Sequence, residues 1–311
     1  MANRTITIMG IFVADLTFRT THMPAWGETI LGLGFKLGPG GKGSNQAVAA
    51  ARLNGQVDFI SKLGRDTFGD LAREIYRKEG IQTSFLLETD HHATGAASIV
   101  VDHVKGENAI IVFPGACSEL TTTEVEQARE LIAASSIFMT QLELPVPLVQ
   151  YALEMAHQLG VPTILNPAPA LPIPEELYAL CDYMTPNETE ASHLSGKRVT
   201  GPDDAELAAD ILLARGVRNV VITLGASGAF VKNANLTAHV PAFEAGAVLE
   251  TTGAGDAFNG GLAVGLSEGM DLIEATRFGC GAAGISVTRN GTAPSMPTRE
   301  EVEALLEKCV G

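Results

Sequence analysis

The sequence predicts an α/β fold in which a doubly wound, mainly parallel sheet carries a small β-sheet lid. From about residue 120 onward, apolar strands alternate regularly with helices, a pattern typical of parallel sheets covered by helices on both faces. Before that point, alternating apolar and polar residues predict extra strands that do not fit this repeat. With 46% hydrophobic and 18% charged residues, the 311-residue chain is suited to a sizeable buried core.

The elements before residue 120 follow from local patterns. Apolar runs predict buried strands, and small-residue or amphipathic runs predict helices. The expected elements are a strand at 5–18, a helix from about Ser44 to 55, a strand at 57–64, a helix at 66–80 and two alternating strands within 95–116. Lys105-Gly106 is the expected turn between the last two strands.

The elements after residue 120 alternate in type. Expected helices are 121–134, 146–160, 188–196, 203–217, 255–269, 271–288 and 299–310. Expected strands are 136–143, 162–169, 183–187, 219–225 and a hairpin within 228–243. Thr298 and Glu301 form a capping box that predicts the start of the last helix.

No linker, low-complexity segment or internal repeat interrupts the chain. We therefore expect a single α/β domain over residues 1–311. The strands that break the alternation are expected to form a lid, inserted at about 14–39 and 92–114.

The composition disfavours several classes of partner. The formal net charge is −15 and no run rich in Lys and Arg occurs, so neither nucleic acid nor an anionic membrane surface is an expected partner. The sequence has no signal-peptide pattern and no apolar run of about 18 residues. The widely spaced Cys117, Cys181, Cys280 and Cys309 are expected to be reduced. These features predict a cytoplasmic protein.

The segment 249–266, LETTGAGDAFNGGLAVGL, carries the strongest chemical pattern. Gly253, Ala254, Gly255 and Asp256 open an apolar helix, and unpaired N–H groups at a helix start can bind a phosphate. Asp256 could take a proton from a hydroxyl while its oxygen attacks phosphorus. The alternative is a tight turn in which Asp256 only caps the helix.

A second glycine-rich stretch, LGPGGKGSNQ, raises the question of a dinucleotide site. The glycines at 38–43 match G-x-G-x-x-G, but the acidic residue about twenty positions further on, Asp58, would start a strand rather than end one. A phosphate-binding P-loop is excluded because Lys36 stands where its first glycine is required. The alternative is that these glycines let Lys42 and Asn45 approach another ligand.

Other polar residues lie at strand ends. Asn187 and Glu190 share one side of a first helical turn, where they could support hydrated Mg²⁺ or form a capping pair. Thr223, Gly225 and Gly228 are at the carboxyl end of a strand, where doubly wound sheets bind ligands.

Two carboxylates, Asp15 and Glu143, lie near the ends of apolar strands. They could accept hydrogen bonds from a polyhydroxylated ligand, although each alone is more typical of a solvated loop.

Taken together and in this order, the motifs resemble the ribokinase group of the PfkB carbohydrate-kinase family. The resemblance runs almost end to end and includes GIFVAD, GGKGSNQAVAAARL, QLELP, TPNETEA, TTGAGDAFNG and VTRNGTAPSMP. It implies ATP-dependent phosphorylation of a sugar at its terminal primary hydroxyl, with D-ribose converted to D-ribose 5-phosphate if the substrate carries over. It also implies that Asp256 is the catalytic base, with the backbone N–H groups of Gly253 to Asp256 as the anion hole.

The resemblance implies the binding residues as well. The sugar-binding set comprises Asp15, Gly41, Lys42, Asn45, Glu143 and Asp256. The ATP-binding set comprises Asn187, Thr223, Gly225, Gly228, Gly255 and Cys280. Glu190 is implied to support hydrated Mg²⁺, and a K⁺ site is implied at Glu250, Thr252, Ser286, Arg289, Gly291 and Ser295. The family's lid commonly forms the contact of a homodimer, which is implied here too.

Two positions depart from the usual ribokinase pattern. Val13 stands where these kinases usually have Asn, which leaves room for a deoxysugar, another pentose or a ketose. Glu250 replaces the more usual Asp of the cation loop. A nucleoside or sugar-phosphate kinase of the same fold is the nearest enzyme alternative, although no Lys/Arg cluster accompanies the sugar positions. A sugar-sensing protein without catalysis is the non-enzyme alternative, against which the intact Asp256 argues.

Overall fold

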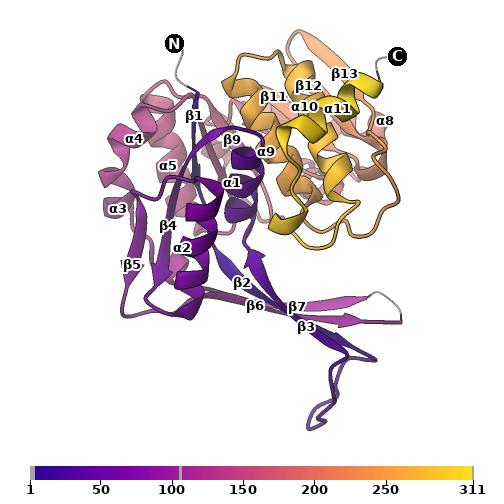
Figure 1. Ribbon diagram of the computed structural model, residues 1–311. Coiled ribbons are helices and arrows are strands. Elements are labelled where there is room, and N and C mark those ends of the chain that lie inside the picture. Colours follow the sequence, from indigo (N-terminus) through magenta and orange to yellow (C-terminus); the bar gives the residue numbers. More distant parts are fainter. Residues whose placement is uncertain (1–3, 105–106, 310–311) are drawn as a thin grey trace.

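The computed structural model describes residues 4–104 and 107–309, so the turn expected at Lys105-Gly106 lies outside the described residues. Two sheets are present in the described chain (Figure 1), one of nine strands and one of four. We call the four-stranded one the lid sheet. Its strands are β3 (Gly34–Gly40), β2 (Val13–Thr20), β6 (Thr94–Asp102) and β7 (Asn108–Gly115) in spatial order.

The large sheet is mainly parallel. Its strands, in spatial order, are β13 (Leu236–Val240), β12 (Ala229–Asn233), β11 (Asn219–Thr223), β10 (Tyr183–Met184), β9 (Thr163–Asn166), β8 (Ile137–Gln141), β1 (Thr5–Met9), β4 (Gln56–Gly64) and β5 (Leu86–Thr89). In the described part of this sheet, the only antiparallel pairs are β11 with β12 and β12 with β13. The chain winds from β1 to β5 in one direction and from β8 to β13 in the other. The point where the order reverses, between β1 and β8, is where such sheets bind ligands.

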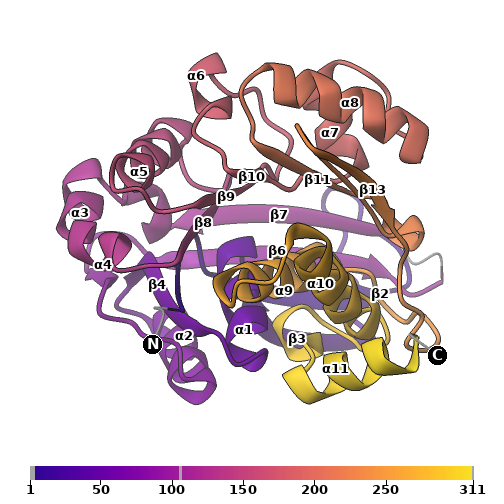
Figure 2. The same cartoon turned by 90° about the horizontal axis from the view of Figure 1, so that it is seen from above.

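Helices cover both faces of the large sheet (Figure 2). One face carries α1 (Lys42–Arg52), α2 (Thr67–Glu79), α9 (Ala254–Ser267), α10 (Leu272–Ser286) and α11 (Arg299–Lys308). The other carries α3 (Thr122–Gln127), α4 (Arg129–Ala133), α5 (Val146–Gln158), α6 (Glu175–Tyr178), α7 (Glu188–Ser195) and α8 (Pro202–Ala214). The predicted doubly wound α/β fold with a separate small sheet is therefore confirmed.

The core explains why the strands read as continuous apolar runs. All five residues of β8 and the last four of β1 are buried, because helices exclude water from both faces of a central parallel strand. No helix in residues 4–104 and 107–309 has the length and apolar character needed to cross a membrane.

The expected boundaries were wrong in three places. The strand expected at 5–18 is two strands in different sheets, because the chain leaves the large sheet after Met9 and enters the lid sheet at Val13. The helix expected at 121–134 is broken at Ala128, whose N–H bonds three residues back instead of four. Helix α1 begins at Lys42, two residues before the expected start, because the Glu143 carboxylate accepts the Lys42 N–H at 2.7 Å.

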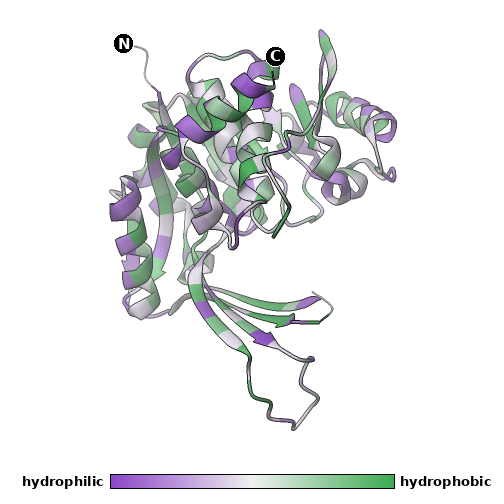
Figure 3. Cartoon of the chain, turned by 45° about the vertical axis from the view of Figure 1, so that its right-hand side comes forward, coloured by the Kyte–Doolittle hydropathy of each residue, from purple (hydrophilic) through white to green (hydrophobic). Residues whose placement is uncertain are grey.

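The two faces of the lid sheet differ in their surroundings. Asp15, Thr17 and Arg19 of β2 point to a cavity between the lid sheet and the segments 248–252 and 290–294, whereas the residues between them point away. The register pairs Thr17 with Ile99 of β6, and Ile99 in turn with Ile110 of β7. These three residues therefore share the inner face of the lid sheet. The lid sheet extends away from the body of the molecule (Figure 1) and carries apolar residues on its strands (Figure 3).

Candidate active site

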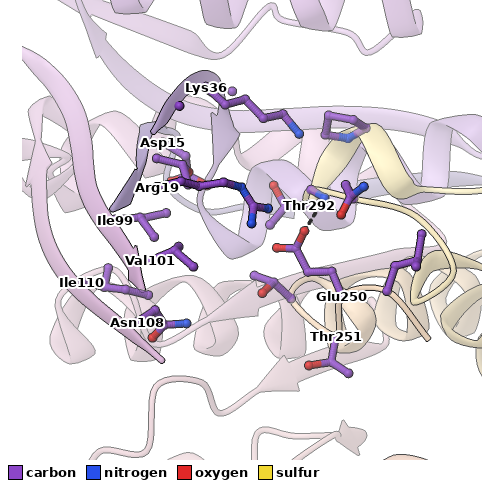
Figure 4. Close-up of a pocket in the computed structure, with 18 of the residues that line it drawn as sticks. Asp15, Arg19, Lys36, Ile99, Val101, Asn108, Ile110, Glu250, Thr251 and Thr292 are labelled. Carbon is purple, nitrogen blue, oxygen red and sulfur yellow. Dashed lines mark hydrogen bonds between the residues drawn. The ribbon is translucent and has the colours of Figure 1, made fainter. Parts of the chain in front are cut away.

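Two adjoining cavities lie beside the start of α9, and the smaller one also lies at the carboxyl ends of β9 and β11. The larger, with a volume of about 700 Å³, is lined by the inner face of the lid sheet and by segments 248–252 and 290–292 (Figure 4). The smaller has a volume of about 290 Å³, and Asp256 lies in its wall. Thr251 and Thr252 line both, so the two spaces meet beside the start of α9.

Helix α9 opens directly onto the smaller cavity. Gly253 caps the helix in a left-handed conformation with a φ of 86°, and no side chain caps the first turn. The Ala254 N–H donates to the Thr251 carbonyl, whereas the N–H groups of Gly255 and Asp256 have no acceptor among the described residues. Unpaired N–H groups at a helix start attract anions, so this geometry suits a phosphate.

The carboxylate of Asp256 is held by two amides. Asn45 Nδ2 donates to Oδ2 at 3.0 Å, and Gln46 Nε2 donates to Oδ1 at 3.0 Å. Asp256 is 6% exposed. Burial raises its pKa, whereas Lys42 and the two amide hydrogen bonds lower it. The carboxylate is thus oriented while keeping a lone pair on each oxygen for another partner.

Lys42 is the basic group nearest this carboxylate. Burial alone would lower the pKa of Lys42, but the carboxylates of Asp256, Glu143 and Glu190 outweigh burial and raise it. Burial also raises the pKa of Glu143 to about 7, and Lys42 opposes this. The site therefore combines several carboxylates with one half-buried ammonium, a charge balance that suits an uncharged acceptor together with metal cations.

Asp15 lies at the inner end of the larger cavity. Its carboxylate lies against Gly40, where a Cβ would come within 2.2 Å of Oδ1, so any other residue there would displace the Asp15 side chain. Burial, and then repulsion from Asp256, raises the pKa of Asp15 to about 6. Gly41 caps α1, and Lys42 lines the smaller cavity, whereas Gly41, Asn45 and Glu143 line neither cavity. The oxygen Oδ1 of Asn45 is buried and has no hydrogen-bond partner within the described residues.

Asn187 and Glu190 form the capping pair that the sequence allowed. The Asn187 side chain accepts from the Glu190 N–H at 2.9 Å, and the Glu190 carboxylate accepts from the Asn187 N–H at 2.9 Å. Both residues also line the smaller cavity. Capping and a site for a hydrated cation are therefore compatible here, since carboxylate oxygens keep further lone pairs.

The expected ATP-binding residues are only partly brought together. Thr223, at the end of β11, lines the smaller cavity with Gly255. Gly225 and Gly228 lie in the turn after β11 and line neither cavity. Cys280 is a residue of α10 in a buried apolar cluster, and burial raises the pKa of its thiol to about 12.

The six expected cation positions lie on two neighbouring segments. The Glu250 carboxylate accepts the Gly291 N–H at 2.8 Å (Figure 4), and the Glu250 N–H donates to the Val287 carbonyl at 3.2 Å. The other expected positions are on these same segments: Thr252, Ser286, Arg289 and Ser295. No group of three or more His, Cys, Asp or Glu side chains in the described chain is arranged to hold a metal ion.

Several residues of the site escaped the sequence analysis. Gln46, Gln141 and Asn166 form a buried amide network with Asp256, and the last two end strands β8 and β9. Polar residues that end apolar strands are a readable signal for such positions. Arg19 and Lys36 of the lid sheet point into the larger cavity (Figure 4), although they are far apart in sequence and form no cluster there.

Comparison with known proteins agrees with this geometry. The model of the family described as "pfkB family carbohydrate kinase" matches residues 3–299 of the chain. The chain belongs to the pfkB family. Membership in this family of carbohydrate kinases confirms both the family recognised in the sequence and the predicted class of ATP-dependent sugar kinases.

Individual pfkB-family proteins resemble this chain along its whole length. It is 41% identical to the ribokinase of Haemophilus influenzae over 304 residues, which are 98% of this chain and 99% of the relative. It is 36% identical to the deoxyribokinase of Salmonella typhimurium, with 97% and 98% covered. The ribokinase of Arabidopsis thaliana, solved with ribose and ATP, superposes with a TM-score of 0.93 at 30% identity and covers 99% of each chain.

Proposed function

We propose that this pfkB-family chain is a ribokinase, which transfers the terminal phosphoryl group of ATP to the primary 5-hydroxyl of D-ribose. The observation that carries the proposal is the position of Asp256. Its carboxylate lies at an anion-binding helix start, in the wall of the smaller cavity and beside the opening into the larger one. A base at this junction can serve a hydroxyl that enters from one side and a phosphate that enters from the other.

In this proposal the two cavities have different ligands. The sugar occupies the inner end of the larger cavity, which Asp15 lines. Asn45 and Glu143 line neither cavity and would supply further acceptors for its hydroxyls from behind the cavity walls. ATP occupies the smaller cavity, with Asn187 and Thr223 beside it. Asp256 takes the proton of the attacking hydroxyl, and the free N–H groups of α9 stabilise the charge on the transferred phosphoryl group.

The donor set of the smaller cavity suits Mg²⁺ that keeps most of its water. Glu190 and Asn187 offer oxygen atoms next to the proposed ATP phosphates, and Mg²⁺ in kinases is typically held by one or two carboxylates plus phosphate oxygens. When bound, Mg²⁺ would neutralise phosphate charge.

A monovalent cation, K⁺, fits the segments around 250 and 286–295. Their donors are mainly backbone carbonyls and hydroxyls, with one carboxylate from Glu250. Because Glu250 already accepts the Gly291 N–H, its side chain connects the two segments that would surround the ion.

A second substrate, 2-deoxy-D-ribose, is favoured by Val13. This residue is 4% exposed and lies on the same face of β2 as Asp15, where ribokinases usually carry an amide. An apolar side chain removes one hydrogen-bonding group from this face. A sugar that lacks a hydroxyl at this point would therefore lose less binding energy than a sugar whose hydroxyl is left without a partner.

We further propose a homodimer formed through the outer face of the lid sheet. Phe18, Leu37, Ile111 and Phe113 alternate with the cavity-lining residues of their strands and are exposed. Such contiguous exposed apolar residues are typical of protein–protein contacts. A cytoplasmic location is proposed from the four cysteines, which form no disulfide in the described residues.

The proposal is tested by a substrate panel. ADP release would be measured with D-ribose, 2-deoxy-D-ribose, D-fructose, D-tagatose and adenosine, each with and without K⁺, and the products would be identified by mass spectrometry. We expect the highest kcat/KM for D-ribose, 5-phosphorylated product and faster turnover with K⁺. Turnover of 2-deoxy-D-ribose above D-ribose would establish the second substrate instead, and no turnover of any acceptor would contradict the kinase proposal.

A further inference from the structure

Gln46 holds the carboxylate of Asp256 without lining either cavity. Its Nε2 donates to Asp256 Oδ1 at 3.0 Å and also to Asn166 Oδ1 at 3.1 Å. Its Oε1 accepts from Gln141 Nε2 at 2.6 Å. The side chain is fully buried and is not among the residues that line the two cavities.

The orientation of the Gln46 amide is determined by a backbone carbonyl. Asn166 Nδ2 donates to the Thr185 carbonyl at 2.9 Å, so its oxygen must face Gln46. Facing this oxygen and the Asp256 carboxylate, the amide of Gln46 must present its NH₂ group to both and its oxygen to Gln141. Each group in this series of hydrogen bonds, from the Thr185 carbonyl through Asn166 and Gln46 to Asp256, therefore has only one possible arrangement of donors and acceptors.

The close packing of α1 on α9 makes this contact possible. A Cβ at Gly260 of α9 would lie 2.6 Å from Ala49 Cβ and 3.0 Å from the Gln46 carbonyl oxygen. Only glycine at this position allows the two helices to approach so closely. As a result, the Gln46 side chain reaches the first turn of α9 from behind, away from the proposed substrates.

We propose that Gln46 is a positioning residue for the base, and that it fixes the Asp256 carboxylate in the orientation from which it accepts the proton of the sugar hydroxyl. Asn166 and Gln141 act through Gln46 by fixing its amide. The inference rests on the proposed kinase function. It adds a role for a side chain that does not touch sugar or ATP.

The contact also affects when Asp256 is ionised. The charged groups that face Asp256 are Lys42 from α1, Asp15 from β2, Glu143 after β8 and Glu190 from α7. The Gln46 hydrogen bond favours the carboxylate, so its loss raises the pKa of Asp256. The acidic limb of the kcat profile should then move to higher pH, since the base must be ionised to act.

The test replaces Gln46 by methionine, which keeps the length of the side chain and removes the amide. Phosphorylation of D-ribose would be followed across pH with the full-length enzyme. In Gln46→Met we expect kcat to fall by about 10- to 100-fold, with an unchanged KM for ribose and an acidic limb at higher pH. A Gln141→Met variant keeps Gln46 and frees its oxygen, so we expect a smaller fall in the same direction.

Double variants separate positioning from a general structural effect. Gln46→Met in an Asp256→Asn background should lower kcat no further, because Gln46 acts only through this carboxylate. Asn233→Ala removes a comparable amide-to-amide hydrogen bond, of 2.8 Å to Asn219, from strands β11 and β12 and should leave kcat and its pH profile unchanged. Binding of a non-hydrolysable ATP analogue checks that each variant is folded.

The possible results are distinct. A folded Gln46→Met enzyme with wild-type kcat and pH profile would overturn the inference, as would a further loss of kcat in the Asp256→Asn background. If Gln46→Met does not fold, a Gln141→Met enzyme with wild-type kcat and pH profile overturns it. A wild-type enzyme that phosphorylates no sugar would instead contradict the proposed function, and the inference with it.

Discussion

The side-chain amide of Asn45 donates a 3.0 Å hydrogen bond to the carboxylate of Asp256, although 211 positions separate the two residues in sequence. Asn45 belongs to the first turns of α1 and Asp256 to the first turn of α9. The two glycine-rich motifs of the chain therefore form one site. One motif carries the proposed base and anion hole, and the other supplies the amides that hold the base.

The half-buried carboxylate of Glu143 predicts a pH-dependent stability. Removal of this carboxyl from water raises its pKa to about 7 in the folded protein, from an ordinary value of 4.5. The folded state therefore binds this proton more tightly. The stabilisation is complete below about pH 4.5 and is lost as the pH rises through about 7.

Glu143→Gln should remove this pH-dependent loss of stability, because glutamine does not titrate. The oxygen of the glutamine amide can still accept the Lys42 N–H. Urea denaturation of the ligand-free enzyme would give the free energy of unfolding of both proteins at about pH 5 and about pH 8. The decrease between these two pH values should be smaller in the variant than in the wild type, by on the order of 1–3 kcal/mol. The same pH dependence in both proteins would contradict the prediction. Sugar binding should weaken in the variant even where stability increases.

Arg52 anchors the loop that carries Ser295, the last of the proposed cation positions. Its Nη2 and Nε donate to both oxygens of Glu79 at 2.7 and 3.0 Å, and its Nη1 donates to the carbonyls of Ala293 and Met296 at 3.1 and 3.0 Å. Arg52→Gln should lower the free energy of unfolding by about 2 kcal/mol, because charged hydrogen bonds are lost in a partly buried position. Equal stability of the variant and the wild type in urea denaturation would argue against this anchor.

A matched control for Arg52 is Arg65, whose side chain is 58% exposed and pairs with Glu88 and Asp90. Arg65→Gln should cost less than about 1 kcal/mol, since exposed ion pairs contribute little to stability.

Val13 predicts the choice between ribose and deoxyribose. Val13→Asn should raise the ratio of kcat/KM for D-ribose to that for 2-deoxy-D-ribose by about 3- to 10-fold, the effect of one added hydrogen bond to a hydroxyl. Val13→Ala, which removes methyl groups without adding an amide, should leave the ratio near the wild-type value. An unchanged ratio in Val13→Asn would show that this position does not select the sugar.

The outer face of the lid sheet predicts the oligomeric state. Ile111 and Phe113 are 72% and 57% exposed in the single chain. Changing both to lysine should convert a dimer to monomers in sedimentation velocity, because charges would be buried in the contact. Leu207→Lys on α8, with a comparable exposure of 59%, should leave the dimer intact. A monomeric wild type, or a double variant that still dimerises, would refute the proposed contact.

The fold was readable from the sequence because the pattern of elements depends on local periodicity. The capping pairs at Asn187 and Thr298 were readable for the same reason, since their partners lie three residues away. The start of α1 was not readable from the sequence, because the residue that accepts the Lys42 N–H is Glu143, 101 positions away.

The amide network around Asp256 was missed because no local pattern marks it. Gln46, Gln141 and Asn166 meet only when α1 packs beside the carboxyl ends of β8 and β9. The cavity positions of Arg19 and Lys36 likewise depend on how the lid sheet faces the large sheet. Sequence motifs identified the proposed base and the residues close to it, and tertiary contacts identify the side chains that hold the base.

Asp256 is the proposed base of this sugar kinase, and a comparison of the wild type with Asp256→Asn tests that role. Steady-state phosphorylation of D-ribose would be measured together with calorimetric binding of ribose and an ATP analogue. We expect kcat to fall by about 10²- to 10⁴-fold in the variant while both ligands still bind. Undiminished turnover in a folded Asp256→Asn enzyme would contradict this role.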